Sequence, residues 1–566
     1  MLKNLEVARI FLELADLLEF KGEDYFKVRA YRRAGRALAG LSRPLEELWE
    51  KGEILNIPGV GKNIASKIEE ILKTGTLKKY EELIKTTPRS LLSLMSLPGI
   101  GPKRASLIYE RLGISTVEEL ALAAKEGRLR RLPGIGPKVE KEILQSIEKR
   151  SHRKSRLLLA AAAELAGDVI SFLQTRPEVK RAAEGGSLRR RCETVGDIDL
   201  VVSGRDHSEL TAAVMSHPQV EGIIEEGGGW AKFSTAWGAE LHVEFAPEED
   251  FWEVLFKNTG SKAHLKKLSS RGGSGSAGQL LEEIKGAKSE EEIYARLGLP
   301  YIPPELREDR GEVEAAGEGR LPQLVELSDI KGDLHVHSNW SDGLLALDQV
   351  VSRSLEKGYE YAAVTDHSRS LKVAGGLSEE RLFEQHEKIR EMNKKLKGFR
   401  LFTGIEVEIL PGGGLDFPDE ILKETDVVVA SVHSAFKQDA STMTKRLISA
   451  IENKNVNIIG HLTGRLIGQR RGYDLDVERV LEAAASCGVA LEINASPDRL
   501  DLNDVHARRA AELGVKMCIS TDAHTARGMD DMVYGVYTAR RAWLAPRHVI
   551  NTMPAAQLER FLRARK

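Results

Sequence analysis

The chain has 566 residues, of which 42% are hydrophobic and 30% charged, and this length is more than one hydrophobic core can organise. No run approaches the roughly 18 uncharged apolar residues of a transmembrane helix, and three cysteines without a CxxC pair indicate neither a disulfide scaffold nor a zinc ribbon. Residues 1–156 hold 31 Lys and Arg against 21 Asp and Glu, whereas the remainder holds 52 against 64, so the net charge of −2 combines a basic front with an acidic rest.

The first twenty residues, MLKNLEVARIFLELADLLEF, carry acidic residues throughout and predict an amphipathic helix rather than a secretory signal. We therefore expect a cytoplasmic protein that is monomeric and has no membrane partner. The basic front favours a polyanionic partner. Because basic faces are often merely solvated, charge alone supports nucleic-acid binding only weakly.

A short pattern recurs three times in the basic front, at 55–72, 95–112 and 129–144. Each copy has an apolar turn, then P-G-[VI]-G, a Lys within two positions, and an amphipathic helix. The glycines permit a tight turn with positive φ, and the helix start adds backbone N–H donors, so the turn suits a phosphate. One copy alone is more often an ordinary helix start, but three resemble helix-hairpin-helix motifs, which hold the DNA backbone without reading its sequence. The predicted DNA contacts are Gly59, Gly61, Gly99, Gly101, Gly134 and Gly136.

A basic helix predicted over 25–38 precedes the first copy. Together, the two segments resemble the lyase domain of family X DNA polymerases, in which a Lys on the helix after the turn forms a Schiff base with a 5′ deoxyribose-phosphate. The resemblance assigns that role to Lys67 and phosphate contacts to Lys27 and Tyr31, whereas Asn63 replaces a further family Lys. A surface role for Lys67 is equally compatible with the sequence.

After an Ala- and Leu-rich helix over 156–175, residues 185–202 read GGSLRRRCETVGDIDLVV. Asp197 and Asp199 alternate with apolar residues on a predicted strand, so both face one side and could bridge Mg²⁺ or Mn²⁺. The GSxRR and GDxD sequences resemble the nucleotidyltransferase signature of family X polymerases. This resemblance implies nucleotide binding by Ser187, Arg190 and Gly196.

Several positions depart from the pattern of that family. His242 stands where a third Asp is expected, and an imidazole is either neutral or, when protonated, repels a metal cation. Lys257 and Asn258 replace an aromatic pair, Leu265 replaces a base-contacting Asn, and a flexible Gly/Ser run at 272–278 replaces a strand of the thumb. We expect primer extension to be weakened or lost, and dNTP binding stays open.

A Pro-, Gly- and Glu-rich stretch at 301–323 predicts an exposed connection. From residue 327 onward, apolar strands alternate with helices, and clusters of His, Asp and Glu follow the strands. Strand ends of a closed α/β barrel share one opening, and one ion takes about four to six ligands, so the clusters predict two or three divalent metals. The nine predicted ligands are His335, His337, Asp342, His367, Glu406, His433, His461, Asp522 and His524. Three other histidines, His386, His506 and His548, are expected on the surface.

These nine residues resemble the metal constellation of the PHP (polymerase and histidinol phosphatase) domain, and the order of domains resembles the PolX family over essentially the whole chain. The resemblance implies one metal at His335, His337, Glu406 and Asp522, a second at Glu406, His433 and His461, and a third at Asp342, His367 and His524. Mixed imidazole and carboxylate ligands suit Mn²⁺ or Zn²⁺. Arg465, Arg499 and Lys437 follow strand ends, where they could hold a substrate phosphate, and Asn494 could position the substrate.

The predicted fold is multidomain, α+β and α/β, with helical helix-hairpin-helix domains, a nucleotidyltransferase-type palm and a C-terminal (β/α) metal-dependent PHP barrel. The expected divisions are a lyase-like domain at 1–88, a helix-hairpin-helix domain at 89–150, the palm at 151–258, a reduced thumb at 259–305, a linker at 306–326 and the barrel at 327–566. The predicted function is DNA repair by a 3′–5′ exonuclease or phosphodiesterase acting on gapped, nicked or 3′-ended duplex. Two alternatives are a gap-filling polymerase with PHP proofreading and a non-catalytic DNA-end binder, while a small-molecule phosphatase would have no use for three DNA-binding turns.

Overall fold

The computed structural model describes residues 4–39, 45–50, 52–57, 60–88, 90–95, 97, 99–152, 156–236, 238–271 and 277–564. The chain divides into two units, Met1–Ser155 and Arg156–Lys566. Within the described ranges, no helix is both long and apolar enough to cross a membrane. All three cysteines are free.

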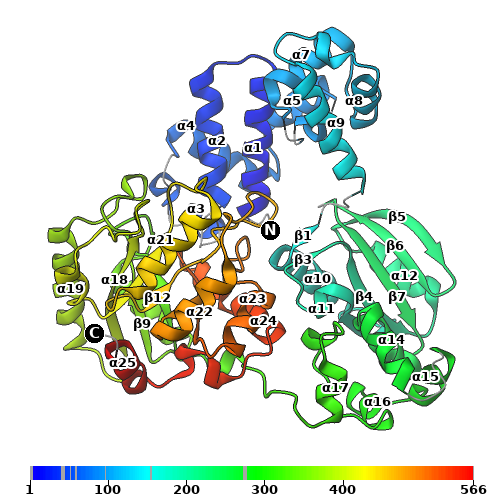
Figure 1. Ribbon diagram of the computed structural model, residues 1–566. Helices are drawn as coiled ribbons and strands as arrows, with labels where there is room; N and C mark the ends of the chain where they lie inside the picture. Colours follow the sequence, from blue (N-terminus) through cyan, green and yellow to red (C-terminus); the bar gives the residue numbers. More distant parts are fainter. Residues whose placement is uncertain are drawn as a thin grey trace. The chain divides into compact units, whose positions relative to one another are not determined.

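The described part of the first unit consists of helices and loops (Figure 1, blue to cyan). The first helix buries Val7, Phe11, Leu14 and Leu18, and this helical spacing forms one apolar face against the second helix. The helices are α1 (Asn4–Phe20), α2 (Tyr25–Ala39), α3 (Leu45–Glu50), α4 (Lys62–Thr74), α5 (Lys78–Thr86), α6 (Ser90–Met95), α7 (Pro102–Leu112), α8 (Val117–Lys125) and α9 (Pro137–His152).

The second unit begins with a five-stranded sheet in the order β2-β4-β7-β6-β5, which is the palm sheet. Strands β4 and β7 run parallel, and the other neighbours are antiparallel. Its strands are β2 (Val179–Glu184), β4 (Ile198–Gly204), β5 (Val220–Gly227), β6 (Trp230–Thr235) and β7 (Glu240–Ala246), beside a small pair, β1 (Leu157–Leu158) and β3 (Thr194–Val195). The helices of this region are α10 (Leu159–Leu173), α11 (Gly186–Arg189) and α12 (His207–Met215).

A helical region follows the palm sheet (Figure 1, green). It comprises α13 (Phe251–Thr259), α14 (Lys262–Arg271), α15 (Ala277–Ile284), α16 (Glu290–Arg296) and α17 (Glu312–Gly317). Arg307 is fully buried here, where it donates to Ile302 O at 2.8 Å and to Glu290 at 2.5 Å. A buried guanidinium requires such partners, so this pair joins α16 to the segment after it.

The prediction of an exposed connection at 301–323 is wrong for much of that stretch. Leu306 and Val313 are buried in the same cluster as the helices before them. The carboxylate of Glu312 on α17 is also buried and lies 2.6 Å from the ring of His264. The abundance of Pro, Gly and Glu obscured a short amphipathic helix whose apolar residues complete the helical core.

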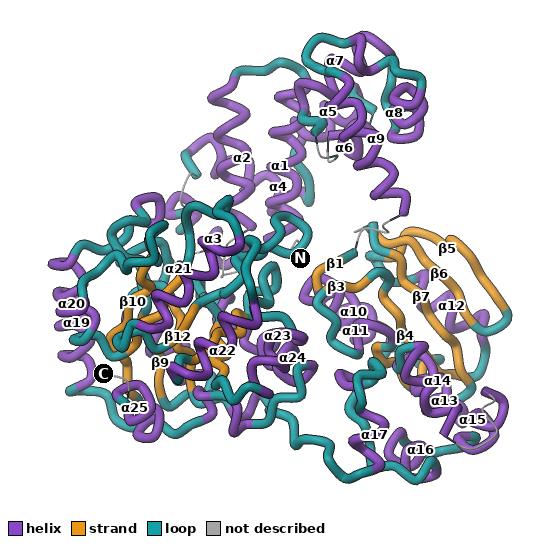
Figure 2. The backbone as a smooth tube through the Cα atoms, viewed as in Figure 1, coloured by secondary structure: helices purple, strands orange, loops and turns teal. Residues whose placement is uncertain are grey.

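The last part of the chain is a parallel seven-stranded sheet in the order β14-β13-β12-β11-β10-β9-β8 (Figure 2, orange strands). A parallel bridge between Val336 and Ala523 and the hydrogen bond from His337 N to Ala523 O, 2.9 Å, join its two edges, so the sheet curls into a barrel. The strands are β8 (Gly332–Val336), β9 (Tyr361–Val364), β10 (Arg400–Glu408), β11 (Val427–Ser431), β12 (Ile458–Ile459), β13 (Ala490–Asn494) and β14 (Met517–Ser520).

A helix follows each barrel strand, as the sequence alternation predicts. These are α18 (Leu347–Glu356), α19 (Glu379–Asn393), α20 (Asp419–Leu422), α21 (Ala440–Glu452), α22 (Val477–Cys487), α23 (Asp504–Glu512) and α24 (Met532–Arg541), and α25 (Ala555–Arg563) comes last. Leu558 and Leu562 of α25 pack in one cluster with Phe402 and Val427, which lie in the first halves of their strands. Since α25 covers the amino ends of the strands, the opposite end is the one left for a site.

His386 is buried on α19, and the expectation that it lies on the surface is wrong. Its helical spacing from Leu382 and Ile389 places it on the inner face of that helix. His506 and His548 are partly exposed.

Candidate functional site

The nine predicted ligands converge at the carboxyl ends of the barrel strands. His335 lies on β8 and Glu406 on β10, and the others follow the ends of β8, β9, β11, β12 and β14. A parallel bridge between His367 and Glu406 brings neighbouring strand ends side by side. The centre of the group is buried, since His335 and Glu406 are 0% and 1% exposed, whereas the side chains of Asp342 and His524 at the rim are 35% and 36% exposed.

The carboxylate of Glu406 lies at the centre of the group. Its two oxygens lie 2.8 to 3.5 Å from ring nitrogens of His335, His337, His367, His433 and His461. Among the described residues, no directional hydrogen bond satisfies its Oε2. A buried carboxylate oxygen with unused lone pairs among imidazole nitrogens fits a shared divalent cation.

Three sets of side chains each bring one donor atom per residue within 4.8 Å of one another. The sets are His337 with Asp342, His367 and His524; His335 with His337 and Asp522; and His367 with Glu406 and His433. Compared with the expected three-ion assignment, His337 and His367 each enter two sets. Nitrogen and carboxylate donors at this spacing suit a group of divalent metals rather than one ion.

The histidines around Glu406 differ in their affinity for protons. Burial opposes the charge on His367 and His433, but Glu406 outweighs it and raises the pKa of His367 to about 10 and that of His433 to about 9. Burial and the neighbouring rings of His524 and His367 instead lower the pKa of His337 to about 3. An imidazole that holds a proton must release it to bind a metal through that nitrogen, so metal binding here is linked to proton release.

Two buried glutamates outside the predicted set hold the histidine rings in place. Glu492 on β13 lies 2.7 Å from His335 Nδ1, and Glu408 on β10 lies 2.9 Å from His433 Nδ1. An ionised carboxylate only accepts, so each Nδ1 carries the proton and each Nε2 is left to face Glu406. The signal in the sequence is an acidic residue inside an apolar strand, in ALEIN and IEVEI, because a buried charge requires a partner.

Two polar side chains reach Asp522 at the edge of the site. Arg499 Nε lies 3.6 Å from Asp522 Oδ2, and the Arg499 side chain is 20% exposed. Asn494 donates to the same oxygen at 3.1 Å. Arg499 is therefore a cation beside the metal group that remains accessible to an anionic substrate.

The other two predicted phosphate contacts lie differently. Arg465 donates to Arg499 O at 2.8 Å and to Glu193 at 2.6 Å, so its guanidinium joins a barrel loop to the segment before β3. Lys437 is exposed on the loop after β11. Only Lys437 of these two extends into solvent.

In the palm sheet, Asp199 on β4 pairs with His242 on β7. The ring Nδ1 of His242 lies 3.1 Å from Asp199 Oδ1, and its Nε2 lies 3.7 Å from Glu244 Oε1. The hydrogen bond with Asp199 raises the pKa of His242 against the effect of burial, and Glu244 adds to the rise. The His242 ring, between two carboxylates, thus occupies the position of the family's third Asp, while Asp197 directly precedes β4.

The turn before α11 is filled by side chains of the protein itself. A Cβ added at Gly186 would lie 1.7 Å from Asp199 Oδ2, and one at Gly185 would lie 1.9 Å from Asn258 Oδ1. The backbone of the predicted phosphate cradle is therefore in close contact with these two side chains. Ser187 lies in α11 and is half-buried.

Arg190 and Gly196 also lie against other residues. The Arg190 side chain donates to Glu308 at 3.0 Å and to Thr259 O at 2.9 Å. A Cβ at Gly196 would lie 3.2 Å from Arg156 Nη1. The Glu308 carboxylate would therefore compete with a nucleotide triphosphate for the Arg190 guanidinium.

The three predicted DNA-binding turns lie at the starts of α4, α7 and α9. Gly61 and Gly101 are the N-caps of α4 and α7 with extended backbone, and a Cβ at Gly61, Gly101, Gly134 or Gly136 would meet no atom within 4 Å. Positive φ occurs at Gly99 and Gly134, the first glycines of the second and third turns, and not at Gly61, Gly101 or Gly136. Gly59 lies outside the described residues. The helix starts leave backbone N–H groups open to a phosphate.

The predicted lyase residues lie close together on α2 and α4. Lys67 Nζ donates to Asn63 Oδ1 at 2.8 Å and lies 6.0 Å from the centre of the Tyr31 ring. Tyr31 is only 6% exposed, and burial raises its pKa. Lys27 is paired with Glu23 at 3.0 Å.

Comparison with known families gives four matches along the chain. A helix-hairpin-helix domain model matches residues 2–77, a SAM-like helix-hairpin-helix tandem matches 91–149, a DNA polymerase beta thumb matches 254–308, and a PHP domain matches 333–496. The thumb match shows that the region after the palm keeps a family resemblance despite its Gly/Ser run.

Whole-protein comparison gives relatives of two kinds. The chain is 37% identical over 568 residues to the "DNA polymerase/3′-5′ exonuclease PolX" of Bacillus subtilis, covering 99% of both chains. A "probable phosphatase" of Thermoanaerobacter sp. strain X514 is 29% identical over 41% of this chain and 95% of its own, and another of Caldanaerobacter subterraneus is 32% identical over 34% of this chain and 75% of its own. The predicted fold class and PolX-like order of domains are confirmed, and DNA binding and divalent-metal binding follow from them. The chain belongs to the PolX family.

Proposed function

We propose that the barrel of this protein is a metal-dependent 3′–5′ exonuclease or phosphodiesterase acting on DNA, and that it is the principal catalyst of the chain. The observation that carries the proposal is the buried Glu406 carboxylate, whose two oxygens face five imidazole nitrogens at the open end of the barrel. A structural metal site closes with about four ligands, and the larger set favours a catalytic group of ions over the non-catalytic alternative.

Two or three bound divalent ions would lower the pKa of water toward neutrality and neutralise charge developing on a phosphodiester. Glu492 and Glu408 keep the Nε2 atoms of His335 and His433 free to serve as ligands. Arg499 is placed to hold a substrate phosphate beside Asp522. The mixture of imidazole and carboxylate donors favours Mn²⁺ or Zn²⁺ over Mg²⁺ alone.

DNA as the substrate is supported by the front unit of the chain. Its three turns offer backbone N–H donors, and the positive charge of residues 1–156 suits a polyanion. The Bacillus relative that covers the whole chain is called a polymerase and 3′–5′ exonuclease. The proposed DNA substrates are gapped, nicked or 3′-ended duplexes. The front unit contacts only the DNA backbone, so the barrel would select the DNA end.

We further propose that primer extension by the palm is weak. His242 places an imidazole where a metal-binding carboxylate is needed, and Asp199 is engaged with that ring at 3.1 Å. Arg190 is occupied by Glu308, and the turn at Gly186 is packed against Asp199. The alternative, a gap-filling polymerase with PHP proofreading, is favoured by the retained Asp197 and Asp199, the thumb match and the name of the Bacillus relative.

A lyase role for Lys67 is a separate proposal. Its Nζ lies beside the buried ring of Tyr31 and is hydrogen-bonded to Asn63. Borohydride should trap the Schiff base between the protein and a 5′ deoxyribose-phosphate end, and Lys67→Ala should abolish this adduct while Lys73→Ala on the same helix retains it. Trapping of Lys67→Ala to the same extent as the wild type would mean that Lys67 is a surface lysine without a lyase role.

One assay on a labelled one-nucleotide-gap duplex with Mn²⁺, with and without dNTPs, tests the main proposal. We expect shortening of the 3′ strand in the wild type, loss of shortening in His335→Ala, and retention in Asp197→Ala. His548→Ala, which changes a partly exposed histidine away from the site, is the matched control. Thermal unfolding in EDTA shows whether His335→Ala still folds.

The outcomes separate the candidates. Shortening that persists in His335→Ala would refute the site assignment. Robust gap filling that disappears in Asp197→Ala would make the palm the principal catalyst. Absence of both shortening and extension would favour the non-catalytic DNA-end binder.

A further inference from the structure

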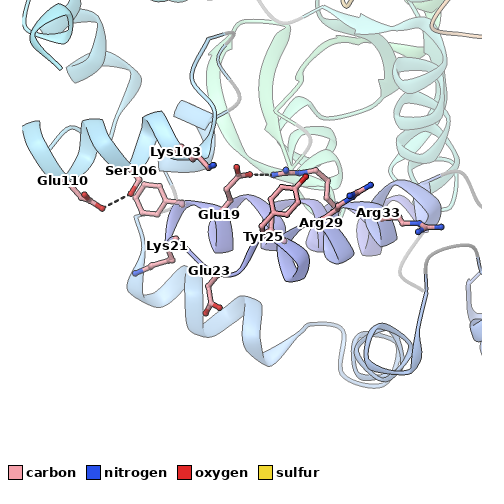
Figure 3. Close-up of a pocket in the computed structure, with 13 residues that line it drawn as sticks. Glu19, Lys21, Glu23, Tyr25, Arg29, Arg33, Lys103, Ser106 and Glu110 are labelled. Atoms are coloured by element: carbon pink, nitrogen blue, oxygen red, sulfur yellow. Dashed lines mark hydrogen bonds and ion pairs between the residues drawn. The ribbon is translucent and has the colours of Figure 1, made fainter. Parts of the chain in front are cut away.

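A cavity of about 210 Å³ lies within the second unit, where the palm meets the barrel. Its walls come from the segment between α11 and β3, from the loop before α17, and from α23 and α24 of the barrel. None of the nine candidate metal ligands lines this junction cavity. It is also separate from the cavity of about 700 Å³ in Figure 3, which lies among α1, α2 and α7 of the DNA-binding front unit.

Guanidinium groups outnumber carboxylates around the junction cavity. Among the described residues that line it, the two acids are Glu193 and Asp504, and the arginines are Arg156, Arg191, Arg310 and Arg541. Glu193 accepts from Arg465 at 2.6 Å. Asp504 accepts from Arg310 at 2.8 Å and from Arg541 at 3.1 Å. Because both acids already have guanidinium partners, the spare charge is positive and favours an anionic ligand.

Arg156 is an exposed residue whose guanidinium is held at the cavity by β3. Its Nε donates to Thr194 Oγ1 at 2.8 Å and its Nη2 donates to Thr194 O at 2.5 Å. It forms no ion pair with any described residue. A guanidinium carries five N–H donors in one rigid plane, so these two bonds orient Arg156 and leave its Nη1 for a ligand.

Arg191 and Arg310 also keep donors for a ligand. Arg191 donates through Nη1 to Glu184 at 2.6 Å and lies over the Tyr537 ring, 4.6 Å from its centre. Arg310 donates through Nη1 to Asp504 at 2.8 Å. The Nη2 of each has no hydrogen-bond partner in the part of the chain that the structure describes. Both guanidinium groups are thus fixed on one side and open on the other.

The size and lining of the cavity narrow the choice of anion. Pockets for drug-sized ligands usually exceed about 300 Å³, so a volume of about 210 Å³ suits a smaller group. Planar guanidinium groups match the oxygens of a phosphate in pairs. Thr194 adds a hydroxyl, whose oxygen accepts from Arg156 and whose own O–H is left to donate to a phosphate oxygen.

We propose that the junction cavity binds a phosphate group, held by the guanidinium groups of Arg156, Arg191 and Arg310. A bound phosphate would neutralise the spare positive charge and contact both the palm and the segment that leads into the barrel. The proposal goes beyond the proposed function, because binding at this cavity requires neither a metal nor cleavage.

This chemistry has two sources in a protein that acts on DNA. One is a backbone phosphate of a strand whose 3′ end lies in the barrel, and the other is a free nucleoside monophosphate. A chain of contacts from the cavity to the metal group supports the first source. Arg465 donates both to Glu193 and to Arg499 O, and Arg499 Nε lies 3.6 Å from Asp522 Oδ2.

Cys192 lines the junction cavity and serves as its reporter. Alkylation by iodoacetamide is followed by mass spectrometry of the Cys192 peptide in the full-length protein with EDTA. The added probe is inorganic phosphate, dAMP or a single-stranded oligonucleotide, each compared with sodium chloride at equal ionic strength. We expect at least one of these phosphates to slow alkylation of Cys192. Cys487 on α22 is the internal control, because it lies outside the cavity, and its alkylation rate should not change.

The variants assign the effect to the cavity. Arg156→Ala and Arg310→Ala should each weaken binding of the protecting probe about tenfold in calorimetry, because each removes a charge-assisted hydrogen bond. Arg156→Lys keeps the charge without the planar group and should recover only part of the affinity. Arg320→Ala changes an exposed arginine that pairs with Glu318 outside the cavity, and it should bind as the wild type does. Thermal unfolding shows whether each variant is folded.

The outcomes decide both the site and its ligand. Protection by inorganic phosphate and dAMP assigns the cavity to a free phosphate monoester, whereas protection by the oligonucleotide alone assigns it to a backbone phosphate. Equal alkylation of Cys192 with every probe and with chloride would overturn the proposal, as would undiminished protection in both alanine variants. His335→Ala should protect Cys192 as the wild type does, so loss of the nuclease and loss of this site are distinguishable.

Discussion

Glu492→Gln tests whether the buried carboxylate behind the metal group sets the chemical state of its histidines. Glu492 accepts four hydrogen bonds: Oε1 from His335 Nδ1 and Ser520 Oγ, both at 2.7 Å, and Oε2 from His461 N at 2.6 Å and Asn494 Nδ2 at 3.2 Å. Glutamine preserves the shape but turns one acceptor into a donor. The substitution therefore changes hydrogen-bond chemistry with little change in packing.

Both orientations of the new amide are unfavourable. With its NH₂ toward His461 and Asn494, the amide would face two N–H donors, and a buried unpaired donor costs about 1–3 kcal/mol. With its NH₂ toward His335, the imidazole must move its proton to Nε2, the nitrogen that faces Glu406 and Asp522 and is needed as a ligand. Loss of a carboxylate behind a metal-bound histidine typically lowers metal affinity about 10- to 100-fold, or about 1–3 kcal/mol.

Competition with a chelator measures Mn²⁺ affinity in the wild type, Glu492→Gln and Glu482→Gln, an exposed glutamate on α22 that is the matched control. We expect a 10- to 100-fold loss for Glu492→Gln and none for Glu482→Gln. Thermal unfolding in EDTA separates an effect on the site from an effect on folding. Affinity within twofold of the wild type in a folded Glu492→Gln protein would refute the argument.

Three further predictions follow from buried charges. His367 and His433 have pKa values of about 10 and 9 without metal, so both are protonated at pH 7. Metal affinity should therefore rise about tenfold per pH unit for each proton that the metal displaces. Calorimetry in buffers of different protonation enthalpy should detect the released protons, and absence of proton release would contradict the assignment of these residues as ligands. Arg307→Ala should destabilise the second unit by about 1.5–3 kcal/mol in denaturant unfolding, since the buried Glu290 carboxylate loses one of its two guanidinium partners and keeps only Arg189 at 2.6 Å. Arg296→Ala at the surface should cost less than about 1 kcal/mol. His242→Asp should raise Mg²⁺-dependent primer extension at least about tenfold, because one oriented electrostatic contact to a transition state contributes on the order of 100-fold, and unchanged extension would show that the palm is limited elsewhere.

The cluster of candidate metal ligands was predictable from the sequence because its residues follow a repeated pattern of apolar strands. Apolar strands followed by His, Asp or Glu indicate parallel strands whose carboxyl ends meet, and the barrel topology then brings together residues as distant as His335 and His524. The prediction needs only the order of strands and the side to which their ends point. It does not need the position of any individual atom.

Contacts between residues far apart in the chain could not be predicted from the sequence, because no local pattern encodes them. Arg465 follows a strand end as expected, yet its guanidinium meets Glu193, which lies 272 residues earlier. Residues 301–323 have the composition of a linker, yet Val313 is buried through contacts with helices before it. In both cases the surroundings of a residue, rather than its neighbours in the chain, decide its role.

The palm illustrates the same limit at a functional position. The sequence places His242 at the site of the missing Asp, and alternation along β7 puts Glu244 on the same face two residues later. Only the structure shows that the ring lies between Asp199 and Glu244, at 3.1 and 3.7 Å. Because Asp199 and Glu244 raise the pKa of His242, they favour the protonated ring, whose positive charge would lie close to where a metal ion would bind. The loss of a ligand and the gain of a cation both act against metal binding at the palm, and together they support the proposal that the barrel is the principal catalyst.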